Sequence, residues 1–259
     1  MRAVIITAGL ICAMCAAAQE TPGPALTADR IIEKSIEAAG GREAMEKLTS
    51  TMSKGTMEFT AQGMHSTVEF YAKAPNKRLI VMNMEGFGEV KQGFDGTVAW
   101  SSNPAQGVTE VTGEALANVK RDAVFNDALK WRERYTKAEL KGKRTVGGRE
   151  VYAVEMTPKA GSPVTNYYDA ETFLLVGFSG MGSTPQGPTE IRTEMSEYRE
   201  IGDGVKAPFR VKQIMPAGEI VMKYSEIKNN IDIDDARFSK PAPEKKSAPD
   251  LPEKQPRPR

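Results

Sequence analysis

The sequence is poor in the residues that carry most metal and nucleophile chemistry. It contains two cysteines, Cys12 and Cys15, and a single histidine, His65. Zinc and transition-metal sites use several His or Cys ligands, so no such metal is expected here. His65 follows the turn glycine Gly63 on a polar stretch, where a solvated histidine is far more common than a catalytic base. We therefore interpret His65 as a surface residue.

Common catalytic and nucleotide-binding motifs are also missing. The sequence has no G-x-S-x-G, no phosphate-binding glycine loop and no dinucleotide fingerprint. The acidic run Asp232, Asp234 and Asp235 lacks the glycine and terminal glutamate of a calcium loop, and it is interpreted as a solvated turn. Two carboxylates can meet anywhere in a fold, so a carboxylate-based hydrolase stays open as the least favoured function. The sequence predicts a protein that is not an enzyme and that needs no cofactor or metal.

Charge of either sign is not in excess. The chain has 35 basic and 34 acidic residues and a formal net charge of +1. Nucleic-acid-binding proteins show a basic excess gathered on one face, and this composition gives no sign of one. Nucleic acid is therefore not an expected partner.

The N-terminal residues have the pattern of an export signal. A short basic start precedes an apolar run over residues 3–18, which ends in three alanines. This pattern predicts a signal peptide over residues 1–18, cleaved near Ala18, and hence a periplasmic protein. The run is too short to span a bilayer. A buried N-terminal helix is the alternative, which the polar, proline-containing residues 19–24 disfavour.

Both cysteines would leave with this signal peptide. Ile11 and Met14 precede them, whereas a lipoprotein signal needs a small residue before the cysteine that receives the lipid. We therefore expect a mature chain without thiols and without a lipid anchor.

The remaining chain divides into a linker, one domain and a tail. Residues 19–26 are predicted to be a linker, and residues 27–239 a single β domain. Residues 240–259 are rich in proline and charge and offer one aliphatic side chain, Leu251. Such a stretch cannot repay the entropy of ordering, so it is predicted to be a disordered tail. Contact of this tail with anionic lipid or peptidoglycan is the alternative.

Helical patterns occur in two places. Residues 27–48 begin at a plausible N-cap, Thr27, present isoleucines on one face, and are interrupted at Gly40. Residues 113–131 carry apolar residues at a spacing of three to four without turn residues, which predicts an amphipathic helix.

Elsewhere the apolar period is two. About ten runs alternate apolar and polar residues and are separated by short turns, such as Gly63 and Asp95-Gly96. The sequence therefore predicts a mainly β fold, a curved antiparallel sheet forming a half-open β-barrel. Alternation buries one face of this sheet, and the helices are the expected cover.

Methionine is abundant within the strand patterns. Eleven of the 13 methionines lie beyond the predicted signal peptide. Flexible thioethers suit binding surfaces that accept ligands of varied shape, although each methionine could equally fill a gap in the core. With a curved sheet and a thin helical cover, they favour an apolar cavity.

Several phrases of the sequence resemble one family. They are Gly148-Arg149-Glu150-Val151-Tyr152-Ala153-Val154-Glu155-Met156, the turn Asp169-Ala170-Glu171-Thr172, and residues 198–209 and 231–238. Together they resemble the outer-membrane lipoprotein-sorting proteins related to the periplasmic carrier LolA. The resemblance implies a half-open barrel lidded by helices that shelters acyl chains in transit. Phe173 stands where relatives commonly have glycine, so the turn is predicted not to be the usual left-handed one.

The first functional hypothesis is a periplasmic carrier or chaperone for the acyl chains of lipoproteins or lipids. Strand alternation predicts ten cavity-lining residues: Met57, Phe59, Val68, Phe70, Leu79, Val81, Trp100, Tyr152, Val154 and Met156. The second hypothesis is a non-catalytic protein-binding or envelope-sensing module with a filled core. Envelope membrane proteins are further candidate partners, and we expect a monomer.

Overall fold

A computed structural model describes residues 26–184 and 187–242 of the chain. The predicted signal peptide, and most of the predicted linker and tail, lie outside these residues.

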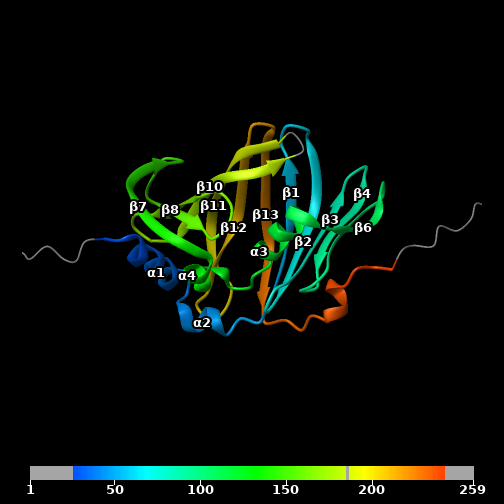
Figure 1. Cartoon of the computed structure of the whole chain (residues 1–259), viewed down its shortest axis with the longest axis horizontal. Helices are drawn as coiled ribbons and strands as arrows, with labels where there is room; N and C mark the ends of the chain where they lie inside the picture. The colour runs from blue at the N-terminus through cyan, green and yellow to red at the C-terminus, as the bar shows by residue number, and fades with distance from the viewer. Residues whose placement is uncertain (1–25, 185–186, 243–259) are drawn as a thin grey trace, which may run out of the picture.

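Within the described residues, thirteen strands form one antiparallel sheet (Figure 1). Its order is β6-β5-β4-β3-β2-β1-β13-β12-β11-β10-β9-β8-β7. The strands are β1 (Ser50–Phe59), β2 (Met64–Lys73), β3 (Lys77–Met84), β4 (Gly88–Phe94), β5 (Ala99–Asn103), β6 (Gly107–Val111), β7 (Tyr135–Val146), β8 (Arg149–Pro158), β9 (Val164–Asp169), β10 (Leu175–Thr184), β11 (Gly187–Glu200), β12 (Lys206–Met215) and β13 (Gly218–Asn229). Two runs of hairpins thus meet where β1 pairs with β13, and the sheet stays open between β6 and β7. The predicted curved, mainly β fold is confirmed.

The helices in the described part of the chain are few and short. They are α1 (Ala28–Ala38), α2 (Arg42–Glu46), α3 (Gly113–Asp122), α4 (Trp131–Arg134) and the 3-10 turns η1 (Asp127–Lys130) and η2 (Asp235–Phe238). Because β6 and β7 are the two edges of the sheet, the chain between them must cross the sheet. Residues 112–134, which carry α3, η1 and α4, make this crossing and are called the crossing segment (Figure 1).

The two predicted helical regions differ in outcome. The first is helical as expected: Thr27 caps α1 by accepting a hydrogen bond from the Arg30 backbone amide, and α1 ends before Gly40. The second is not one helix, because Asn126 adopts a left-handed conformation (φ 52°) between α3 and η1. The Asn126 amide donates to the Met45 carbonyl, which holds this break against α2.

Register separates the strand residues onto two faces. Met57 lies opposite Met222, Val68 opposite Met82, and Phe70 opposite Ile80. We call this the inner face, because α1 and α3 pack against it: α1 on Val154, Met156 and Tyr168, and α3 on Phe94 and Ala99. The opposite face is called the outer face.

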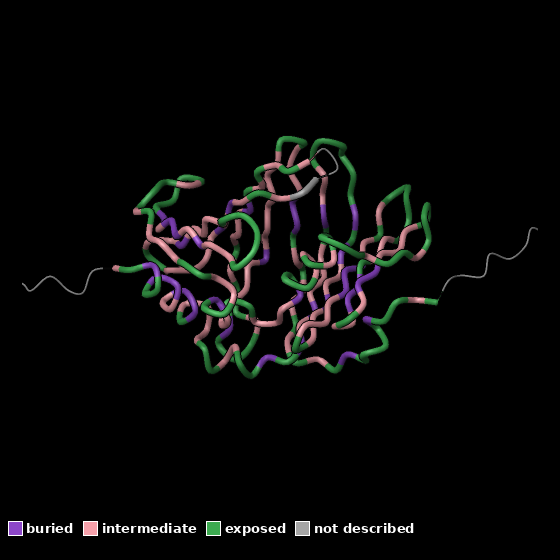
Figure 2. The backbone as a smooth tube through the Cα atoms, in the orientation of Figure 1, coloured by how far each residue is buried: buried purple, intermediate pink, exposed green. Residues whose placement is uncertain are grey.

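The outer face carries an apolar row of its own. Met52, Tyr71, Leu79, Gly93 and Trp100 lie opposite one another across neighbouring strands. Residues 231–238, called the C-terminal segment, cover this row, with Ile233 and Phe238 buried against it. Figure 2 shows buried positions in α1 and along the strands, whereas the hairpin turns are exposed. The sheet is therefore a middle layer with apolar cover on both sides.

The turn at Phe173 departs from the sequence prediction. Phe173 adopts a left-handed conformation (φ 60°), so the expectation that this turn avoids it is wrong. Asp169 accepts hydrogen bonds from the backbone amides of Glu171 and Thr172, which fixes the turn. The Phe173 ring stacks on Tyr152, with 5.8 Å between centroids, and the Lys34 ammonium lies 4.3 Å from its centroid. Side-chain packing therefore offsets the strain that glycine would avoid.

The described residues include no helix with the length and apolarity needed to span a membrane.

Candidate ligand-binding face

An apolar patch occupies the inner face of the central strands. Met57, Val68, Ile80 and Met222 form its buried centre. Phe70 packs edge-on against Tyr224 with 5.9 Å between ring centroids, and both rings stay half-buried. Burial raises the pKa of Tyr224 to about 12, so its hydroxyl stays neutral at physiological pH. The patch offers adaptable apolar area with little charge.

One cavity lies between α1, α4 and strands β8, β9, β11 and β12. Its volume is about 260 Å³, and its apolar walls include Ile32, Ile36, Trp131 and Met156. Tyr168 also borders it, and burial raises the pKa of this tyrosine to about 12. The Asn166 amide donates to the Tyr168 hydroxyl at 3.2 Å. This end of the inner face is thus a pocket with apolar walls and a fixed polar pair, Asn166 and Tyr168. The ion pair of Arg134 and Asp127 also borders it.

Two further cavities lie along the crossing segment. One, of about 360 Å³, lies under α3 and has Ile80, Phe94, Ala99, Val111 and Val119 among its lining residues. The other, of about 420 Å³, is lined by residues that include Phe70, Ala72, Ala123 and Phe125. Arg78 and Asp122 border both cavities, so the two adjoin. Their volumes fall within the range of about 300–1,000 Å³ typical of ligand pockets.

The crossing segment that covers these cavities is firmly held at its second half, where Trp131 is buried and Trp131 and Arg132 both donate to Glu33, and it is less firmly held over α3. The Phe125 backbone amide donates to the Pro75 carbonyl at 3.0 Å, and Arg42 donates to the Leu129 carbonyl at 3.3 Å. No residue of α3 itself is buried, although Leu116 and Val119 pack on the sheet. Elements with little buried area open at low free-energy cost, so α3 is the part of this cover that opens most readily.

The structure places the ten predicted cavity residues on both faces. Met57, Phe59, Val68, Phe70, Tyr152, Val154 and Met156 lie on the inner face. Leu79, Val81 and Trp100 pack in the outer cluster beneath the C-terminal segment, so the expectation of one shared face is wrong for them. The cause is strand parity, since a shift of one residue moves a side chain to the other face. Trp100 borders one cavity on each side of the sheet.

Sequence reasoning missed several inner-face residues. Ile80 and Arg78 share the parity of Phe70 once β2 and β3 are paired, but that pairing register was not available from the sequence. Trp131 and the isoleucines of α1 were seen only as helix residues, although they form the wall of the 260 Å³ cavity.

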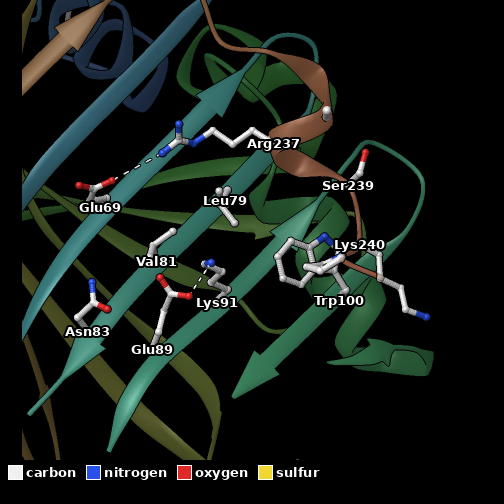
Figure 3. A pocket seen from close by; sticks show the side chains of 12 residues that line it. Glu69, Leu79, Val81, Asn83, Glu89, Lys91, Trp100, Arg237, Ser239 and Lys240 are labelled. Carbon is white, nitrogen blue, oxygen red and sulfur yellow. Dashed lines mark ion pairs between the residues drawn. The ribbon is translucent and has the colours of Figure 1, made fainter. Parts of the chain in front are cut away.

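The outer face holds a cavity of about 540 Å³ (Figure 3). Leu79, Val81 and Trp100 form its apolar floor, and the C-terminal segment forms one wall. Its rim is charged: Arg237 pairs with Glu69 at 3.8 Å, and Lys91 with Glu89 at 2.6 Å. Lys240 also lines the cavity and pairs with Glu110 at 2.7 Å, so each cation of the rim has an acidic partner.

The remaining side chains that could carry chemistry are exposed or have structural roles. His65 is exposed on β2. Asp234 caps η2 by accepting from the Ala236 amide, and Asp235 pairs with Lys73 and Lys77. The acidic run is therefore more than a solvated turn, because it fixes the C-terminal segment to β2 and β3. The described part of the chain contains no group of three or more His, Cys, Asp or Glu that could hold a metal.

Comparison with known proteins gives matches in structure alone. No family model matches the sequence, and no curated protein sequence matches it. A DUF1329 family protein from Desulfovibrio piger is similar over 82% of this chain and 97% of its own, with 15% identity and a TM-score of 0.58. A LolA superfamily protein from Nitrosomonas europaea is similar over 83% and 99%, with 18% identity and a TM-score of 0.56.

A third similar structure is a domain from Vibrio parahaemolyticus assigned to outer-membrane lipoprotein sorting. It matches 80% of this chain and 97% of its own length, with 12% identity and a TM-score of 0.52. At such identities similarity establishes the fold and leaves the activity to the site. The open thirteen-stranded sheet with its helical cover has the LolA-like fold, as the sequence resemblance predicted.

Proposed function

We propose that this protein is an exported, periplasmic carrier that shelters acyl chains of lipoproteins or lipids between its inner face and its helices. The observation that carries the proposal is the set of apolar cavities beneath α1 and the crossing segment. An acyl chain needs apolar area and little else, and each buried methylene contributes about 0.8 kcal/mol. The LolA-like fold and the lipoprotein-sorting assignment of a similar structure support this reading.

Native mass spectrometry of the protein exported to a bacterial periplasm tests the proposal. The purified protein is measured intact, then extracted with organic solvent, and the extract is analysed for lipids and acylated peptides. The carrier function predicts a bound mass that disappears on extraction and reappears as an acyl lipid or lipopeptide. An unliganded mass that added acyl lipids do not change contradicts it.

A protein-binding or envelope-sensing module is the second candidate. The outer cavity favours it, because at about 540 Å³ it is larger than each inner cavity described above and has both apolar floor and charged rim. Interface cores combine apolar anchors with a polar rim in this way. Crosslinking in the intact envelope separates the two functions: one protein partner attached around Trp100 and no extractable lipid favours the module.

A further inference from the structure

Arg78 is a cation placed on the inner face of the sheet. It lies on β3, opposite Ala72 on β2 and Phe94 on β4, two residues before the buried Ile80. It is half-buried and borders both cavities of the crossing segment. Arg78 therefore lies where the two cavities adjoin. Their other walls combine apolar side chains with polar ones such as Ser53 and Gln92.

Arg78 lacks a protein partner. Its neighbour Lys77 points the other way and pairs with Asp235. Among residues 26–184 and 187–242, no group forms a hydrogen bond or an ion pair with the guanidinium of Arg78, whose backbone pairs with β2 and β4. Asp122 borders the same two cavities, but it pairs with Arg121, 3.4 Å from its Nε.

An unpaired guanidinium beside apolar walls is costly. Partial burial removes water from the charge, and no carboxylate of the described residues compensates. Its field reaches its surroundings, because the charge of Arg78 acts on the Tyr224 hydroxyl and opposes the burial that raises the pKa of Tyr224. An anion bound at the cavity junction would supply the missing partner.

We propose that Arg78 binds the anionic headgroup, a carboxylate or a phosphate, of an acyl ligand whose chain occupies the adjoining cavities. This deepens the proposed carrier function and rests on it. The planar guanidinium offers paired donors that match both kinds of anion. The apolar walls formed by Phe70, Ile80 and Val119 supply contact for the chain. The ligand class is thus an acyl anion rather than a neutral lipid.

Three probes that share a 14-carbon chain test the assignment on the chain without its first 18 residues. They are myristoyl lysophosphatidic acid, myristate and monomyristoylglycerol, and calorimetry gives each Kd. Wild-type protein is expected to bind both anions more tightly than the neutral glyceride. Arg78→Gln is expected to raise the Kd of both anions about tenfold or more, which is the effect of losing a charged hydrogen bond. It should change the Kd of the glyceride less than twofold. Arg78→Lys should restore part of the loss.

Two further variants separate headgroup binding from a structural role. Asp122→Asn removes the one carboxylate among the residues that border both cavities. It is expected to lower the Kd of the two anions and to leave the Kd of the glyceride unchanged. Arg192→Gln, which removes a cation from a surface pair with Glu194, is the matched control and should change no Kd.

Each outcome decides between the claims. A phosphate preference or a carboxylate preference that Arg78→Gln removes supports the assignment and identifies the headgroup. Equal loss of all three probes in Arg78→Gln, or no preference for anions in the wild type, overturns it while leaving the carrier function standing. Failure of every probe to bind the wild type overturns both.

Discussion

The indole nitrogen of Trp100 donates a hydrogen bond to the backbone carbonyl of Phe238, 2.8 Å away and 138 residues further along the chain. Both residues are almost fully buried. Two more hydrogen bonds join the C-terminal segment to the outer face. The Ser50 hydroxyl donates to the Ile231 carbonyl, and the Lys73 ammonium donates to the Ile233 carbonyl. The C-terminal segment thus covers the outer face of strands that come from the first half of the chain.

This closure predicts a large effect of Phe238→Ala. The ring is fully buried in the outer cluster, so its removal leaves a cavity and exposes the row beneath it. Truncation of a buried phenylalanine costs about 3–5 kcal/mol of unfolding free energy. Urea denaturation measures it, with Phe87→Ala as control, because Phe87 is 47% exposed. A loss no larger than that of the control would mean that the segment does not stabilise the domain.

The ion pairs of Asp235 with Lys73 and Lys77 predict that the stability of the domain depends on pH. Hydrogen bonds from Lys73 and Lys77 lower the pKa of this carboxyl from its ordinary 3.8 to about 2. A depressed pKa contributes stability that is fully present above the unfolded value and is lost as pH falls toward about 2. Wild type should therefore exceed Asp235→Asn in stability at pH 7, and the difference should shrink between pH 5 and about 2.

Thermal unfolding of the two proteins across this pH range gives the measurement. Glu171→Gln is the control, since Glu171 is an exposed turn residue. A difference that stays constant down to about pH 2 would show that the lysine pairs do not act on Asp235 in solution.

The left-handed backbone of Phe173 predicts that its glycine variant is more stable than its alanine variant. Phe173→Ala loses the stacking on Tyr152 and keeps a left-handed backbone that costs a residue with a side chain about 1–2 kcal/mol. Phe173→Gly loses the same contacts but adopts this conformation freely. The glycine variant should therefore be more stable than the alanine variant by about 1 kcal/mol, measured by urea denaturation. The reverse order would place this turn in another conformation.

Much of the fold follows from local patterns, and the exceptions have identifiable causes. Thr27, the first isoleucines and Gly40 mark α1, and clean alternation in β1 and β2 puts Met57 and Phe70 on the correct face. In β3, apolar residues occupy consecutive positions from Leu79 onward, so alternation gives no parity. The face of β3 is set by its pairing with β2 instead.

The cavities depend on contacts between distant parts of the chain. Alternation alone places Trp100 on the inner face, because no residue near it in the sequence indicates an apolar cover on the outer face. That cover comes from Phe238. The inner cavities likewise depend on the break at Asn126, which turns one expected helix into a crossing segment. Local periodicity predicts neither the cover by Phe238 nor the break at Asn126.

Filling a cavity should impair ligand binding without unfolding the protein. Ala72 on β2 lines the 420 Å³ cavity beside Phe70. Ala72→Phe should raise the Kd for monomyristoylglycerol, because the new ring occupies space that the chain needs, at a stability cost of about 1–3 kcal/mol. Ala105→Phe, in the exposed turn between β5 and β6, is the control for added apolar area. Equal affinities of the two variants would exclude this cavity as the binding site.

The most direct test of the central claim is the position of a bound acyl chain on the sheet. A myristoyl glyceride with a diazirine at the end of its chain is photolysed on the protein, and mass spectrometry locates the crosslinks. β3 provides an internal reference, because Ile80 faces the inner cavities while Leu79 and Val81 face outward. The carrier function predicts crosslinks at residues that line the inner cavities, such as Phe70, Ile80 and Val119. Crosslinks confined to Leu79, Val81 and the C-terminal segment would contradict it.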